Sequence, residues 1–154
     1  MLIYGVNLDV STNQPVIILK DKEGKQFLPI WVGQFEATSI LMELQGIKPT
    51  RPLTHDLLKS VLDEFEVKTT RVVITELKEG TFYARIHLIK DSVPFEIDAR
   101  PSDAIALSVR AKARIYVDEE VMDQAAILSK GGAEEEIERF KEFLDSIEPA
   151  DFNP

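Results

Sequence analysis

The sequence predicts an α+β fold, with mostly antiparallel sheets formed by two similar β-β-β-α halves and with helices packed on them. Strand-like segments follow one another at hairpin spacing, and apolar residues recur at helical spacing only in separate segments. A weak internal repeat is also present at an offset of 67 residues: Ile30 aligns with Ile97, and Glu36 aligns with Asp103. Each half therefore ends in a helix with an acidic residue near its start.

The first half begins with strand-like segments at residues 2–10, 16–19 and 26–32. Pro29 lies in the last of these and predicts an edge strand or a bulge, because proline cannot donate to the sheet. Apolar residues at helical spacing predict a helix over 34–45, and Gly46 supplies its stop. A stiff loop at 47–52 follows. Thr54 is then the expected N-cap of a second amphipathic helix.

The second half has strand-like segments at residues 68–77, 81–90 and 94–98. Lys78-Glu79-Gly80 is a typical turn between the first two of them. Pro101 suits the first turn of another helix. A short strand at 115–117 and a helix over 118–128 complete a predicted domain of residues 1–128.

Residues 129–154 read as an appendage. Ser129-Lys130-Gly131-Gly132 is the best linker in the sequence. The segment after it is strongly acidic and is expected to form an amphipathic helix, with an apolar stripe of Ile137, Phe140, Phe143, Leu144 and Ile147. We expect this stripe to pack on the body or on another subunit.

Composition limits the functions that this chain can have. The 154 residues include no cysteine, which excludes disulfides, thiolate metal sites and cysteine nucleophiles. Absence of cysteine suits a reducing compartment, and no apolar run is long enough for a membrane span, so we expect a cytoplasmic protein. The net charge of −9 falls entirely on residues 118–154, whereas residues 1–117 carry 15 basic and 15 acidic side chains. The body is therefore neutral, with no strong basic track for nucleic acid.

The first candidate site is the segment Arg51-Pro52-Leu53-Thr54-His55-Asp56. The positive end of the helix dipole favours a neutral imidazole at His55, which can accept a proton or bind a metal. Asp56 is favoured by the same field, and Arg51 precedes it on a stiff loop from which it can contact phosphate. The alternative is ordinary capping, with His55 exposed.

The second candidate is Asp98-Ala99-Arg100-Pro101-Ser102-Asp103, at a predicted strand-to-helix junction. Carboxylates grouped like Asp98 and Asp103 can hold Mg²⁺ or Mn²⁺, and Arg100 can bind phosphate oxygens. Backbone N–H groups at the helix start, near Ser102, add an anion site. Here too the alternative is capping with an internal ion pair. Glu36, the repeat partner of Asp103, is a third carboxylate that could join the metal.

Six blocks of the sequence closely resemble the bifunctional nuclease family: LPIWVGQFEATSI (28–40), RPLTHDLL (51–58), RVVITEL (71–77), GTFYARI (80–86), IDARPSDAIAL (97–107) and IYVDEEV (115–121). They occur in order over about residues 1–125. The resemblance implies an α+β fold, association as a homodimer, and nuclease activity on RNA and DNA, which has been assigned chiefly in plant members. The matching motif positions are Glu36, Arg51, His55, Asp56, Asp98, Arg100, Ser102 and Asp103.

The leading hypothesis is a metal-assisted phosphodiesterase that acts on RNA and DNA. Asp98, Asp103 and Glu36 would hold a divalent ion, Mg²⁺ or Mn²⁺. His55 would act as the general base or orient water, with Asp56 beside it. Arg51 and Arg100 would bind the scissile phosphate, together with Ser102. The alternative is a non-catalytic dimeric binding or interaction module in which the two junctions serve only the structure.

Overall fold

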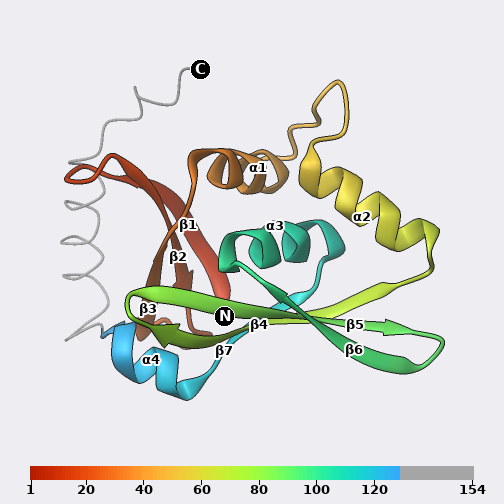
Figure 1. Ribbon diagram of the computed structural model, residues 1–154. Helices are drawn as coiled ribbons and strands as arrows, with labels where there is room; N and C mark the ends of the chain where they lie inside the picture. Colours follow the sequence, from red (N-terminus) through yellow and green to blue (C-terminus); the bar gives the residue numbers. More distant parts are fainter. Residues whose placement is uncertain (129–154) are drawn as a thin grey trace.

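The computed structural model describes residues 1–128, which form two four-stranded sheets and four helices, an α+β fold as predicted (Figure 1). The linker and the acidic helix predicted for 129–154 lie outside the described residues. The elements are β1 (Leu2–Asp9), β2 (Gln14–Lys20), β3 (Gln26–Trp31), α1 (Gln34–Leu44), α2 (Thr54–Glu64), β4 (Lys68–Lys78), β5 (Thr81–Lys90), β6 (Val93–Ala99), α3 (Pro101–Ala111), β7 (Arg114–Val117), α4 (Glu119–Ala125) and β8 (Ile127–Leu128).

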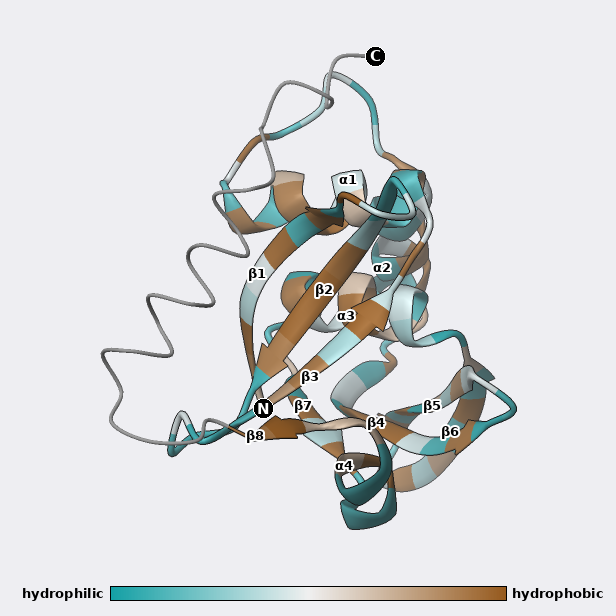
Figure 2. Ribbon diagram, turned by 90° about the vertical axis from the view of Figure 1, so that its left-hand side faces the viewer, coloured by the Kyte–Doolittle hydropathy of each residue, from teal (hydrophilic) through white to brown (hydrophobic). Residues whose placement is uncertain are grey.

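The first sheet has the strand order β1-β2-β3-β8, and all its pairs are antiparallel. Its central strand β2 is hydrophobic along most of its length (Figure 2), and its apolar residues from Val16 to Leu19 are each at most 4% exposed. β3 pairs with β8 only at Gln26 and Phe27. At Pro29 the strand therefore has a free edge, as the missing proline N–H predicts.

The second sheet has the order β6-β5-β4-β7, with antiparallel pairs except for the parallel pair of β4 and β7. The turn between β4 and β5 has positive φ at both Glu79 (49°) and Gly80 (77°). This is the turn geometry that matches the twist of a tight hairpin, and it requires a residue such as glycine. The predicted turn at 78–80 therefore sets the register of the two longest strands.

Helix α3 lies in the middle of the molecule and packs against α1, α2, β4 and β5 (Figure 1). Ala104, Ile105, Ala106 and Leu107 are at most 1% exposed, so α3 is buried on nearly all sides in its first two turns. Small and branched residues on one helix allow this close approach to two helices and a sheet. The N-terminal ends of the three long helices are thereby positioned by a single core.

Two local expectations differ from the structure. The helix predicted over 118–128 ends at Ala125, and Ile127 and Leu128 instead pair with β3. This pairing with a distant strand overrides the local pattern. The N-cap of α2 is Leu53, not Thr54, because the carboxylate of Asp56 accepts a hydrogen bond from the Leu53 N–H at 2.9 Å. None of the helices within residues 1–128 is long and apolar enough to cross a bilayer.

Candidate functional site

The first turns of α1, α2 and α3 are connected by side-chain hydrogen bonds. Each carries an acidic residue at its third position: Glu36 in α1, Asp56 in α2 and Asp103 in α3. The unpaired backbone N–H groups and the dipole of a helix start favour negative charge there. These carboxylates belong to a hydrogen-bonded chain that we call the junction network, formed by Glu36, Ser39, His55, Asp56, Arg100, Asp103 and Arg110.

Arg100 connects two carboxylates at the outer end of the junction network. Its Nε donates to Asp103 Oδ2 at 2.9 Å, and its Nη2 donates to Glu36 Oε1 at 2.7 Å. The predicted repeat partners Glu36 and Asp103 therefore meet on one guanidinium. Its fixed fork of donors allows such bridging, which a lysine ammonium cannot reproduce.

His55 connects Asp103 to the inner end of the junction network. Its Nε2 lies 2.8 Å from Asp103 Oδ1, and its Nδ1 lies 2.9 Å from Ser39 Oγ. Arg110 Nη2 donates to the same Ser39 oxygen at 3.0 Å, which leaves the Ser39 proton free to be donated to Nδ1. In this arrangement neutral His55 carries its proton on Nε2 and donates it to Asp103.

Arg110 closes the inner end. Its side chain is only 5% exposed, and its Nε donates to Asp56 Oδ1 at 2.6 Å. It also donates to the carbonyl oxygens of Ala106 and Ser39. A buried guanidinium needs this full set of acceptors, because an uncompensated charge is costly away from water.

The junction network opens to solvent at the Arg100 end. The side chain of Arg100 is 65% exposed and that of Asp103 31%, whereas that of His55 is 10% exposed. Burial raises the pKa of Asp103, but hydrogen bonds from His55 and Arg100 outweigh burial and lower it below its usual value. Asp103 is therefore an ionised carboxylate beside an accessible guanidinium.

Acid is expected to weaken the fold through this network. Burial also raises the pKa of Asp56, and hydrogen bonds from Arg110 and the Leu53 N–H again outweigh it, so the pKa of Asp56 is lowered. A carboxyl whose pKa is lower in the folded state stabilises the fold above its unfolded pKa of about 4, and this stabilisation is lost as pH falls through the folded value. Urea midpoints measured from pH 7 to pH 2.5 should therefore fall below pH 4, less steeply in Asp103→Asn. Parallel curves for the variant and the parent would contradict this.

The absence of a side chain at Gly33 leaves the space in which the Glu36 carboxylate lies. A Cβ placed on Gly33 would collide with Glu36 Oε2, although the Gly33 backbone (φ −70°, ψ 155°) suits any residue. Gly33→Ala should therefore move the flexible Glu36 carboxylate away from Arg100, with a change in unfolding free energy below about 1 kcal/mol. We expect Gly33→Ala, Glu36→Ala and the double variant to share one thermal midpoint and one activity, because all three remove the same contact. Additive losses in the double variant would contradict this.

Three of the candidate residues predicted from the sequence stand apart from the junction network. Asp98 is exposed on β6 opposite Arg85, on the side of the second sheet that faces away from α3. Arg51 is exposed on the loop before α2, and within residues 1–128 it has no hydrogen bond or ion pair with the network. Ser102 lies in the first turn of α3 and is 5% exposed. Asp98 and Asp103 are thus on opposite sides of the sheet, despite being five residues apart.

The carboxylates of Glu36 and Asp103 have the donor chemistry that Mg²⁺ uses, which is one or two carboxylates completed by water and phosphate. Arg100 occupies one oxygen of each. Among residues 1–128 no group of three or more histidine, aspartate and glutamate side chains is arranged to hold a metal. A divalent ion on this carboxylate pair would therefore share it with Arg100.

Ser39 and Arg110 are parts of the network that the sequence patterns did not indicate. Ser39 lies among the apolar residues of α1 and has the appearance of a core position. Arg110 follows Asp103 by seven residues, which is two helical turns and thus the same face of α3. That spacing was the available signal for Arg110.

Comparison with known proteins places the chain in a family. The family model for the bifunctional nuclease domain matches residues 17–130. An uncharacterized protein of Mycobacterium tuberculosis (strain ATCC 25618 / H37Rv) is 40% identical over 159 residues, covering 97% of this chain and 95% of that protein. Bifunctional nuclease 2 of Oryza sativa subsp. japonica is 29% identical over 119 residues (73% of this chain, 36% of that protein), and bifunctional nuclease 1 of Arabidopsis thaliana is 28% identical over 118 residues (74% and 36%). This chain belongs to the bifunctional nuclease domain family.

Proposed function

We propose that this protein is a nuclease that hydrolyses phosphodiester bonds of RNA and DNA at the junction network. The observation that supports the proposal is the meeting of the first turns of α1 and α3 on one solvent-accessible guanidinium, Arg100, with His55 of α2 on the Asp103 carboxylate. Helix starts and arginine both bind phosphate oxygens, and here they are combined with a histidine–carboxylate pair. The names of the plant relatives agree with this class of reaction.

The residues of the junction network would have distinct roles. Arg100 would exchange a carboxylate for the scissile phosphate and stabilise the charge that develops on it. Asp103, oriented by His55, would position the attacking water, and Asp56 would hold the inner end of the network through Arg110. Mg²⁺ or Mn²⁺ bound by Glu36 and Asp103 would supply further charge stabilisation. Contributions of Arg51, Asp98 and Ser102 stay predictions from the motif.

The test is an assay of purified protein on single-stranded RNA and DNA with Mg²⁺, with Mn²⁺ and with a chelator. We expect cleavage that depends on the divalent ion and that is lost in His55→Ala and in Asp103→Ala. Lys59→Ala, purified in parallel, is the control, since Lys59 forms only a surface pair with Asp63. Activity unchanged in both network variants would remove this site assignment.

A specific observation favours the alternative of a non-catalytic dimeric module. Each carboxylate oxygen of Asp103 and each ring nitrogen of His55 already has a hydrogen-bond partner within the network. A hydrogen-bond network that serves only to stabilise the fold has this property, whereas a catalytic site must release some of these contacts when substrate binds. Absence of cleavage on every substrate, together with a large loss of stability in the network variants, would support the module.

We propose that two copies associate through α2. Leu57, Val61 and Phe65 are spaced by one helical turn and are 58%, 44% and 63% exposed. An exposed apolar stripe of this kind marks an interaction surface, and a two-fold dimer would bury it against itself. Light scattering should give twice the mass of 17.4 kDa, and Val61→Asp should give one chain, whereas Val10→Asp, at a position 62% exposed in the turn after β1, should stay dimeric. A monomeric parent protein would contradict the proposal.

We also propose that the protein works in the cytoplasm, because a chain without cysteine suits a reducing compartment.

A further inference from the structure

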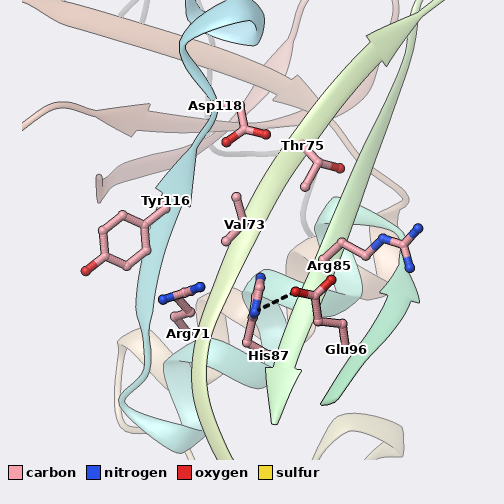
Figure 3. A pocket seen from close by; sticks show the side chains of 8 residues that line it. All are labelled: Arg71, Val73, Thr75, Arg85, His87, Glu96, Tyr116 and Asp118. Carbon is pink, nitrogen blue, oxygen red and sulfur yellow. Dashed lines mark ion pairs between the residues drawn. The ribbon is translucent and has the colours of Figure 1, made fainter. Parts of the chain in front are cut away.

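The second sheet carries a pocket on the side that faces away from α3. Its volume is about 450 Å³, and its lining comes from β4, β5, β6, β7 and the start of α4 (Figure 3). Cavities of roughly 300 to 1,000 Å³ are the usual size for small-ligand sites. The pocket is separate from the junction network, because none of its lining residues belongs to that network.

The charged side chains of this pocket are unevenly paired. Glu96 is directed to His87, whose Nδ1 lies 3.2 Å from Glu96 Oε1. Arg71 and Arg85, on adjacent strands, have no ion pair with any part of the chain that the structure describes. Asp98 lies opposite Arg85 on β6, so Arg71 is the guanidinium best placed to bind an anion with several oxygen atoms, such as a phosphate.

The rest of the lining suits a flat ring with N–H donors. Val73 lies at the centre of the pocket between Tyr116 and Arg85, with Asp118 at one end and Arg71 towards the other (Figure 3). The ring of Tyr116 is 44% exposed and offers a face for stacking. Within residues 1–128 the Asp118 carboxylate accepts no hydrogen bond, so it can accept one from a ligand.

We propose that this pocket binds a nucleotide, with the phosphate on Arg71 and the base stacked against Tyr116 and Val73. The Asp118 carboxylate accepts N–H donors from the edge of the base. Guanine offers two adjacent N–H donors on that edge, whereas uracil places a carbonyl oxygen on each side of its single N–H, so guanine is preferred. This binding does not require hydrolysis at the junction network, and it gives the neutral body a local site for nucleic acid.

The test is calorimetric titration, in buffer with chelator, of GMP, UMP, inorganic phosphate and a five-nucleotide RNA that contains guanine. Arg71→Gln should weaken GMP binding by about tenfold or more, because a charge-assisted hydrogen bond is lost. Arg114→Gln is the matched control. Arg114 is exposed beside Arg71 on the same side of the sheet but does not line the pocket, so affinity should change less than twofold. Tyr116→Leu should weaken GMP but not phosphate, and Asp118→Asn should bring GMP and UMP closer in affinity.

The two sources of the nucleotide are distinguished by the ligands. An RNA that binds at least tenfold more tightly than GMP indicates a strand as the natural ligand, and equal affinities indicate a free nucleotide. Equal GMP affinity in Arg71→Gln and the parent, or an equal loss in Arg114→Gln, overturns the proposal. So does loss of binding in His55→Ala when circular dichroism shows this variant to be folded, since the nucleotide would then lie at the junction network. Nuclease activity without GMP binding would overturn only the proposal that the pocket binds a nucleotide. GMP binding without nuclease activity would overturn only the proposal that the junction network is a nuclease site.

Discussion

Asp103→Asn is expected to lower the turnover of nucleic-acid hydrolysis by about 10² to 10³-fold, the usual effect of removing one group that acts on the transition state. The variant keeps the shape of the side chain and removes the charge that holds both His55 and Arg100. Asparagine keeps one acceptor oxygen, so either the Nε–H of Arg100 or the Nε2–H of His55 would face an NH₂ group that cannot accept its hydrogen bond. The measurement is the initial rate on single-stranded RNA and DNA at saturating substrate, with circular dichroism to verify the fold.

Two further aspartates give this experiment its controls. Asp63→Asn changes the same charge on the exposed side of α2 and should have the parent rate. Asp98→Asn tests the carboxylate pair that the sequence suggested. Since Asp98 faces away from α3, its variant should keep a rate close to the parent. A loss as large as that of Asp103→Asn would restore Asp98 as a functional partner.

Asp56→Ala is expected to lower the free energy of unfolding by about 3–5 kcal/mol, because it leaves a buried arginine without its counter-ion. Arg110 is 5% exposed, and its Nε–H would lose its acceptor. The same change would remove the acceptor of the Leu53 N–H at the start of α2. Urea denaturation at pH 7 gives the value directly.

The control and the rescue for this prediction come from the same helices. Asp63→Ala removes an exposed partner of Lys59 and should cost less than about 1 kcal/mol. Combining Asp56→Leu with Arg110→Met removes both charges and should recover part of the loss, since apolar residues can replace a buried ion pair. A single Asp56→Ala change as mild as Asp63→Ala would show that solvent reaches Arg110 in the folded protein.

The sequence predicted the helices and strands better than the side-chain contacts between them. Hairpin spacing and helical periodicity predicted the α+β class and the two β-β-β-α halves, because these signals are local. The expectation that Glu36 and Asp103 correspond also agrees with the structure, where both are the third residue of a helix. Their connection through Arg100 required the packing of α1 on α3, which no local pattern contains.

Other parts of the site depend on long-range geometry in the same way. Spacing of five residues suggested one site for Asp98 and Asp103, but the strand continues to Ala99 and its alternation turns Asp98 to the other side of the sheet. Ser39 reads as a core residue until His55 is placed 2.9 Å from its hydroxyl. The pocket beneath the second sheet combines residues 71 to 118 through strand order alone.

The pairing of β8 with β3 has a consequence for how the chain folds. Gln26 pairs with Leu128, so the edge of the first sheet is completed only after the whole second sheet has been synthesised. Closing a loop of this length is entropically costly before any contact rewards it, so we expect this step to be late and slow. Both sheets also share one core cluster of buried residues, so residues 1–128 should unfold in one cooperative transition.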